Sequence, residues 1–419
     1  MSDNIKVVVK VRPLIKREID QKLFYQWRIN NNTLYQIDRR GKDVGPSFTF
    51  DKVYDTTTKT EDVYNDVVKN IVEAATRGFN GTIFAYGQTS SGKTYTMRGT
   101  NKVPGIIPLA VLNLFDTIKN IPDRDFVVRV SYIEIYNESL IDLLNLRNTV
   151  RIKKTHSGVK LFTTEKVTVT PEEVLELMKK GNVNRHTGST HMNKKSSRSH
   201  SIFQITIESR VHIEGAEEVD VVNVSLLNFV DLAGLERSGE TGATGLQFKE
   251  GTHINKSLSV LGLVFKQLSE DQNKHVNYRD SKLTRILQNS LGGNSKTSII
   301  CAVTPAAVKE TISTLQFANR AKTIKNTPAE NLVATSSTMI QSLTQEVSSL
   351  KTELEIKKRL ELNLHKDNCN LQEKLANLQR LILDSFDQNR NPDMISNARR
   401  KLHQPRRATI STLHTIQEE

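Results

Sequence analysis

Apolar residues between positions 5 and 325 follow two patterns that alternate along the chain. Short runs rich in Val, Ile, Phe and Tyr, several of them continuously apolar, are typical of buried strands. These runs span residues 6–11, 82–86, 126–136, 201–209, 221–231 and 297–303. Longer stretches with helical spacing separate them, at residues 61–76, 107–120, 171–185, 254–269, 281–290 and 310–323. The alternation predicts an α/β domain over residues 1–325, in which helices flank a central sheet.

Residues 201–231 contain two long strand patterns with a turn near Glu214 and Gly215 between them. A connection this short joins neighbouring antiparallel strands, whereas strands linked through a helix run parallel. The central sheet is therefore predicted to be mixed.

The pattern changes after Lys325. Residues 326–338 include a proline, are mostly polar and lack a helical period, which predicts a linker. Residues 339–386 then repeat apolar positions every seven residues. One position of the repeat holds Ile340, Val347, Leu354, Glu361, Asn368, Leu375 and Ile382, and the other holds Leu343, Leu350, Lys357, Leu364, Leu371, Leu378 and Ser385. Residues 387–419 are polar and basic and are predicted to be disordered.

The seven-residue repeat places a narrow apolar stripe along one helix face. Such a stripe suits a two-stranded coiled coil, so a homodimer is predicted. Lys357, Glu361 and Asn368 put polar side chains in its middle and weaken it. The alternative is a single amphipathic helix that folds onto its own domain.

A glycine-rich motif follows the predicted strand 82–86. Its residues are Gly87, Gln88, Thr89, Ser90, Ser91, Gly92, Lys93 and Thr94, which match the phosphate-binding pattern G-x-x-x-x-G-K-[ST]. Glycines let backbone N–H groups surround a phosphate, and the helix that follows directs its positive end at the anion. Lys93 is expected to reach the terminal phosphates of ATP, and Thr94 to bind Mg²⁺. An ordinary glycine turn is the alternative.

Two further polar segments are candidates for sensing the terminal phosphate. Asp231 ends an apolar strand, where its carboxylate can hold Mg²⁺ through water, and Gly234 can offer its N–H to the phosphate. Asp-x-x-Gly alone is also an ordinary strand-ending turn, so its value comes from occurring with the glycine-rich motif. Residues 193–200 place serines, an arginine and an amide in a loop before a strand. The alternative is an ordinary surface loop, which is often rich in serine as well.

Charge indicates a partner without identifying it. The chain has 59 Lys and Arg residues against 46 Asp and Glu, a net charge of +13. The partner could be nucleic acid, an anionic membrane or an acidic protein, or the charge could serve solubility alone. No apolar run approaches the roughly 20 residues of a membrane span. Cys301 and Cys369 suggest no disulfide framework, so a reducing compartment is expected.

Taken together and in this order, residues 87–94, 193–200 and 231–236 resemble the P-loop, switch I and switch II of the kinesin motor domain. Further kinesin-like strings are found at residues 11–13, 81–86, 134–138 and 278–284, so the resemblance covers residues 5–326. It implies the P-loop NTPase kinesin motor fold and a microtubule-stimulated ATPase that uses ATP and Mg²⁺. It also implies a microtubule as the partner, in place of nucleic acid or a membrane.

The resemblance implies roles for single residues around the nucleotide. Arg12, Pro13 and Tyr95 are expected to flank the adenine. Ser196 and Ser197 are expected to approach the magnesium and the attacking water, with Ser196 as a ligand of Mg²⁺.

The resemblance also implies how the two switches act. Asn193 would contact the phosphates, and an ion pair between Arg198 and Glu236 would close the switches over ATP and exclude bulk water. One departure is Leu235, which stands where kinesins normally have serine, so a hydroxyl in the switch is lost. It motivates an alternative function, a nucleotide-dependent microtubule-binding module without motility. A nucleic-acid-dependent ATPase rests on charge alone, and the kinesin strings argue against it.

Basic residues in the second half of the domain are expected, by the same resemblance, to contact the microtubule. They are Lys249, Lys256, His275, Arg279, Lys282 and Arg285. The last three recur at spacings of three, so on one helix they would share roughly one face. Any one of them could instead be an ordinary solvated charge.

Residues 321–326 resemble the junction between a kinesin motor and its neck linker. An N-terminal motor of this kind usually moves toward the microtubule plus end, and its linker docks when ATP is bound. Residues 122–126, 129–132, 249–255 and 286–294 are most similar to centromere-associated (CENP-E type) mitotic kinesins. This implies the cytoplasm, the cytoskeleton, and the spindle and kinetochore in mitosis. Thr409, after two arginines, is a candidate phosphorylation site.

Overall fold

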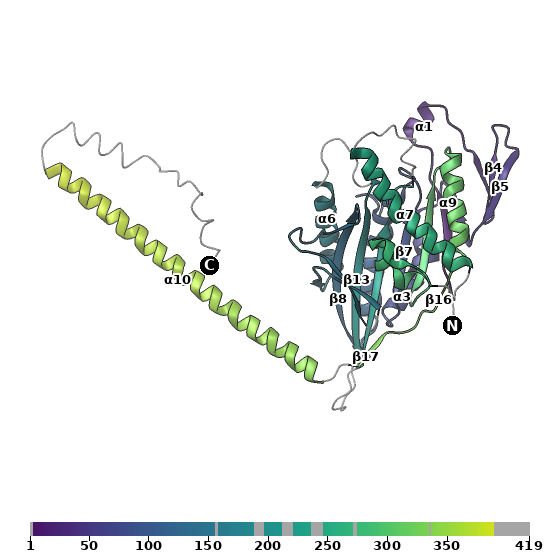
Figure 1. Ribbon diagram of the computed structural model, residues 1–419. Coiled ribbons are helices and arrows are strands. Elements are labelled where there is room, and N and C mark those ends of the chain that lie inside the picture. The colour runs from purple at the N-terminus through teal and green to yellow at the C-terminus, as the bar shows by residue number, and fades with distance from the viewer. Residues whose placement is uncertain are drawn as a thin grey trace. The chain divides into compact units, whose positions relative to one another are not determined.

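The computed structural model describes residues 3–155, 158–187, 197–211, 221–235, 246–270, 275–334 and 337–388. The chain divides into two compact units, Met1–Thr335 and Ser336–Glu419. The first unit is built on a mixed sheet, and the second contains one long helix, α10 (Ser337–Gln388) (Figure 1).

The central sheet of the first unit has eight strands in its main path. Their order is β12 (Lys166–Thr168), β8 (Arg124–Tyr136), β13 (His200–Val211), β14 (Val221–Asp231), β7 (Gly81–Tyr86), β15 (Lys296–Val303), β2 (Lys6–Val11) and β6 (Lys52–Tyr54). From β12 to β14 the neighbours are antiparallel, and from β14 to β6 they are parallel. All six predicted strands are present, and the predicted mixed sheet is confirmed.

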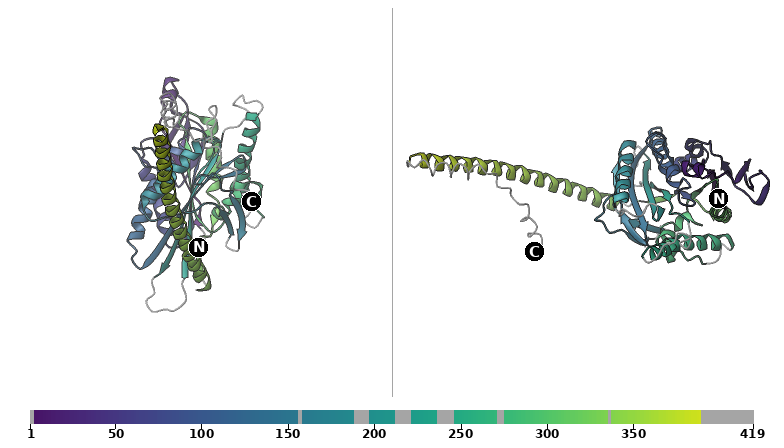
Figure 2. Two further views of the ribbon diagram at one scale, coloured as in Figure 1. Left: turned by 90° about the vertical axis from the view of Figure 1, so that its left-hand side faces the viewer. Right: turned by 90° about the horizontal axis from the view of Figure 1, so that it is seen from above.

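Helices cover both faces of this sheet (Figures 1 and 2). Strand β2 shows why: Val7, Val9 and Val11 enter one hydrophobic core, while Val8 enters the other. The first core includes side chains of α7 (Leu246–Glu270), α8 (Lys282–Ile286) and α9 (Val308–Ala321). The second includes α2 (Thr60–Val63), a π-helical turn (Tyr64–Val68), α3 (Lys69–Ala75), α5 (Ile106–Lys119) and α6 (Pro171–Thr187).

Some elements differ from the prediction. The predicted helix 281–290 is α8 followed by a 3₁₀ turn, Gln288–Ser290, and α7 begins earlier than predicted, at Leu246. Small strands were not predicted because they are short and partly exposed. They form the sheet β3 (Trp27–Asn30), β4 (Thr33–Ile37) and β5 (Asp43–Thr49), the hairpin β10 (Arg151–Thr155) and β11 (Gly158–Phe162), and β9 (Ser139–Asp142) beside β8.

The predicted linker is held on the first unit. Its start, β16 (Lys325–Asn326), pairs with β1 (Asp3–Asn4), and β17 (Leu332–Ala334) pairs with the first residues of β14. The buried Asn326 side chain donates to Ser290 O, Ser295 O and Thr297 Oγ1, and accepts from the Gly292 N–H. Asn331 donates twice to Gly78 O. An irregular stretch of sequence is therefore fixed by long-range hydrogen bonds.

Helix α10 runs unbroken for 52 residues. Its side chains between Leu354 and Ile382 are exposed in the single chain. They include Leu364, Leu371 and Leu378, which belong to the apolar stripe of the seven-residue repeat. Among the helices that the structure describes, none is both long enough and apolar enough to span a membrane. The helix agrees with the predicted repeat, while the coiled coil itself stays a prediction.

Candidate functional site

A cavity of about 760 Å³ lies where β2, β7 and β15 end. The carboxyl ends of parallel strands meet at one edge of a sheet, which is where open α/β folds place ligands. The cavity is lined by Lys10, Val11, Arg12, Pro13, Ile15, residues 56–61, residues 89–96, Val103, Pro104, Ser197 and Ala302. Most of the predicted nucleotide residues therefore meet at one site.

The glycine-rich motif connects β7 to the short helix α4 (Lys93–Arg98). Its turn needs left-handed backbone at Ser90 and Gly92, with φ of 62° and 98°. At Gly87 a Cβ atom would lie 2.1 Å from Ala302 O, so no larger residue fits there. The Lys93 ammonium is buried and donates to Gly87 O and Gln88 O, each at 2.8 Å. A phosphate would take over this lysine from the two carbonyls.

Thr94 and Asp231 meet beside the motif. The Thr94 hydroxyl donates to Asp231 Oδ2 at 2.8 Å, and Asp231 Oδ1 is buried without a hydrogen-bond partner among the described residues. Hydroxyl and carboxylate oxygens are the ligands Mg²⁺ prefers, and it usually keeps several waters. The pair therefore fits a magnesium ion held by few protein groups, and no cluster of three or more ligating side chains occurs in the described ranges.

The two switch segments touch each other. The Gly234 N–H donates to Ser197 O at 2.8 Å. Leu235, which replaces the usual serine, is half-buried and packs against the hydrophobic core. Arg198, which follows Ser197, is half-buried. Asn193, Ser196 and Glu236 lie outside the described residues. The ion pair between Arg198 and Glu236 therefore stays a prediction.

The side of the cavity predicted to hold adenine is built around Arg12. Its guanidinium donates to both oxygens of Glu18 at 2.6 and 2.7 Å and to Ser90 O at 2.7 Å. These hydrogen bonds lower the pKa of Glu18. Tyr95 lines the cavity with 46% of its surface exposed, so its ring is open to a ligand.

Lys10 lies against the same wall. Its ammonium donates to Thr60 Oγ1 at 2.8 Å and lies 5.8 Å from the centre of the Tyr95 ring. Burial lowers the pKa of Lys10 to about 8, an effect that Asp62 opposes.

A buried cluster of charges behind Asp231 was not predicted. Arg185, with no exposed side-chain surface, lies 3.6 Å from Glu134 Oε1 and 3.4 Å from Asp231 Oδ2. Arg98 lies 4.0 Å from the same Asp231 oxygen, and burial lowers its pKa. A signal was available in the sequence, because Arg185 falls in helical phase with the buried Val174 and Met178 of α6.

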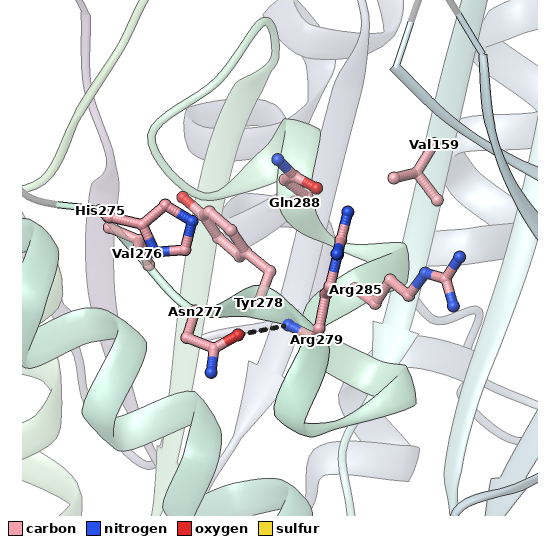
Figure 3. A pocket seen from close by; sticks show the side chains of 8 residues that line it. All are labelled: Val159, His275, Val276, Asn277, Tyr278, Arg279, Arg285 and Gln288. Atoms are coloured by element: carbon pink, nitrogen blue, oxygen red, sulfur yellow. Dashed lines mark hydrogen bonds between the residues drawn. The ribbon is translucent and has the colours of Figure 1, made fainter.

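The predicted microtubule contacts do not all share a helix face. Arg279 belongs to a 3₁₀ turn, Tyr278–Asp280, and the extended Ser281 separates it from α8, so the continuous helix on which one shared face depended is not present. Ser281 caps α8 by accepting from the Leu283 N–H. Arg279 and Arg285 instead line one hollow of about 320 Å³ together with His275 (Figure 3).

The other predicted contacts are placed less completely. Lys256 and Lys282 are exposed. Lys249 belongs to α7, but its side chain lies outside the described part of the chain.

Comparisons with known proteins agree with this arrangement. The family model "Kinesin motor domain" matches residues 10–324. Centromere-associated protein E of Homo sapiens is 46% identical over 359 residues, which are 84% of this chain and 13% of that protein. Kinesin-like protein KIN-7L of Oryza sativa subsp. japonica is 47% identical over 344 residues, 79% of this chain and 52% of that protein. The chain thus spans at most about half the length of either relative.

Two solved structures are similar to most of this chain. A structure of a fast kinesin has a TM-score of 0.72 at 41% identity and covers 79% of this chain and 94% of that chain. A KIF14 dimer with AMP-PNP, in complex with a microtubule, has a TM-score of 0.72 at 36% identity and covers 79% of this chain and 97% of that chain. The family match contains the glycine-rich motif, Asp231 and the hollow around Arg279. The chain belongs to the kinesin family, whose motor domain it carries.

Proposed function

We propose that the first unit is an ATP-hydrolysing motor that microtubules stimulate. The observation that carries this proposal is the meeting of three segments beside one cavity. Thr94 of the glycine-rich motif contacts Asp231 at 2.8 Å, and Gly234, three residues on, contacts Ser197 at 2.8 Å. A group that binds phosphate is thus joined to two loops that can respond to it.

Each part has a role in this proposal. Lys93 leaves its two carbonyls for the β- and γ-phosphates, and Arg12, Pro13 and Tyr95 flank the adenine. Thr94, with Asp231 acting through water, holds Mg²⁺, which when bound neutralises phosphate charge. Ser196 adds a further magnesium ligand, and Asn193 contacts the phosphates.

Hydrolysis requires the switches to close. The Gly234 N–H exchanges Ser197 O for the γ-phosphate, and Ser197 helps to orient the attacking water. The pair formed by Arg198 and Glu236 then excludes bulk water. Gly234 senses the γ-phosphate. We propose that closure of the switches then moves the linker, residues 326–338.

The partner is the acidic surface of a microtubule. Basic side chains at positions 249, 256, 275, 279, 282 and 285 provide the attraction, which salt weakens. The similarity to a structure solved on a microtubule supports this assignment. We further propose that α10 forms a homodimeric coiled coil, that movement is toward the plus end, and that the protein acts at the spindle and kinetochore.

The test is ATP turnover with microtubules, with DNA or RNA, and with neither. We expect strong stimulation by microtubules alone. Lys93→Ala should abolish nucleotide binding, whereas Lys119→Ala, an exposed lysine at the end of α5, should behave as wild type. Stimulation by nucleic acid, or equal turnover in all three arms, would overturn the proposal.

A second candidate is a nucleotide-dependent microtubule-binding module that does not move. It is favoured by the packing of the half-buried Leu235 against the core, which holds the segment next to Gly234. Gliding of microtubules over immobilised protein separates the two functions. Binding that changes with nucleotide but drives no gliding would support the module.

A further inference from the structure

His200, the first residue of β13, joins two elements that are far apart in sequence. Its Nδ1 lies 3.0 Å from the Ala233 backbone nitrogen, and its Nε2 lies 2.8 Å from Ser257 Oγ on α7. The ring and the serine are both buried, with 2% and 4% of their surfaces exposed. Such contacts form a bridge from the strand-ending turn after Asp231 to α7.

The direction of both hydrogen bonds follows from the chemistry. A backbone N–H can only donate, so Nδ1 is the unprotonated nitrogen and Nε2 carries the proton. Nε2 therefore donates to Ser257 Oγ. Burial, followed by the charge of Arg185, lowers the pKa of His200 to about 3, so the ring stays neutral and the bridge keeps this polarity near neutral pH.

The bridge lies next to the proposed phosphate sensor. Ala233 precedes Gly234, whose N–H donates to Ser197 O. If Gly234 moves to reach a phosphate, Ala233 moves with it, and the ring passes that displacement to Ser257. Beyond Ser257, α7 buries Leu258, Leu261 and Phe265 in the core, so the helix responds as a body.

We propose that His200 is a positioning residue that couples the turn at Ala233 to α7, and through α7 to the microtubule. The inference rests on the proposed motor function and deepens it by naming a coupling element. His200 and Ser257 need touch neither ATP nor the track in this role.

Three substitutions separate the two halves of the bridge. His200→Asn keeps an acceptor near the Nδ1 position but is too short to reach Ser257. His200→Gln keeps a donor near the Nε2 position but lacks the acceptor for Ala233. Ser257→Ala removes the acceptor on α7, and Ser259→Ala, exposed on the same helix, is the matched control.

The full chain is assayed for turnover with and without microtubules, and thermal unfolding shows which variants are folded. We expect each of the three substitutions to lower microtubule-stimulated turnover about five- to ten-fold, the cost of one buried hydrogen bond. Ser257→Ala should leave turnover without microtubules within about two-fold of wild type. The hydrogen bond that it removes joins two neutral side chains and, in the proposed role, acts only on the coupling to microtubules. The double variant His200→Asn/Ser257→Ala should be no worse than either single one, since both remove the same bond.

Several results would overturn the proposal. These are full stimulation of Ser257→Ala, an equal loss in Ser259→Ala, or full stimulation of His200→Gln while His200→Asn is impaired. For variants that fold poorly, hydrogen exchange of the α7 amides with ADP and with AMP-PNP replaces turnover. The nucleotide-dependent difference should disappear in Ser257→Ala, and its persistence would refute coupling. A wild-type chain that microtubules do not stimulate would instead refute the motor function.

Discussion

Replacing Arg185 by methionine tests whether the buried charge cluster stabilises the motor domain. The guanidinium donates to Ser199 O at 2.9 Å and to Ser201 Oγ at 3.1 Å, and lies 3.6 Å from Glu134 Oε1. Methionine can replace much of the aliphatic stem but none of these interactions. Glu134, with 1% of its side chain exposed, would then face the interior with one countercharge fewer.

The magnitude follows from the burial. Removing one partner of a buried ion pair typically costs about 3–5 kcal/mol, mostly because the remaining charge stays uncompensated. We therefore expect Arg185→Met to lower the free energy of unfolding by ~3–5 kcal/mol. Adding Glu134→Gln removes the stranded charge and should recover roughly 1–3 kcal/mol of that loss.

Guanidinium denaturation of wild type, both single variants and the double variant measures these differences. Lys180→Met, an exposed lysine on the same helix, is the control and should change stability by no more than about 0.5 kcal/mol. The reasoning is refuted if Arg185→Met lies within ~1 kcal/mol of wild type, or if Glu134→Gln makes the double variant less stable than Arg185→Met alone.

Three further predictions concern other parts of the chain. The pKa of Lys10 is about 8 in the folded protein and 10.5 ordinarily, so between these pH values the folded state binds fewer protons than the unfolded state. The free energy of unfolding should therefore rise with pH in this range, by up to ~3 kcal/mol. Lys10→Met should flatten the rise, and a variant with the same pH profile as wild type would contradict the lowered pKa of Lys10. Asn326→Ala should cost about 2–4 kcal/mol in chemical denaturation, because it leaves buried groups unpaired; a loss below ~0.5 kcal/mol would show that the linker contacts are dispensable. Leu378→Glu should shift the full chain from dimer to monomer in sedimentation analysis, whereas Leu362→Glu, which lies outside the apolar stripe of the seven-residue repeat, should not. Equal behaviour of the two variants would argue against the coiled coil.

The sequence predicted the central elements because their signals are local. Strand β14 reads as an apolar run, and the glycine-rich motif has a fixed spacing that places Gly92 where the backbone is left-handed. Glycine, lysine and threonine at fixed spacing therefore located the cavity before any contact was known.

Other features depend on partners distant in sequence and left little local trace. Asn326 looks like an ordinary polar linker residue, yet its side chain is buried by contacts with residues 290–297. The spacing of three between Arg279, Lys282 and Arg285 gives one shared face only on a continuous helix, and the extended Ser281 interrupts the helix between the first of them and the other two. Spacing alone cannot reveal such an interruption.

Helix α7 offers a physical route between the cavity and the linker. Ser257 of α7 forms a hydrogen bond with Nε2 of His200. Near the end of the same helix, Leu268 packs against Gly292. Gly292 has a φ of 77°, and a Cβ atom there would lie 2.8 Å from Leu268 Cδ2, so the approach is as close as glycine allows. The N–H of the same glycine donates to the Asn326 side chain at 2.8 Å.

A shift of α7 must therefore disturb the contact that holds the start of the linker. Strand β14 also reaches both places, since Asp231 ends it beside the cavity and its first residues pair with β17. However, β14 is hydrogen-bonded along its length to β13 on one side and to β7 over its last five residues on the other, which leaves it little freedom to move alone. A helix anchored by side chains can shift at lower cost than a strand inside a sheet, because its own hydrogen bonds move with it. In the motor function proposed above, α7 is therefore a better carrier of movement from the phosphate to the linker than the strand that joins them directly.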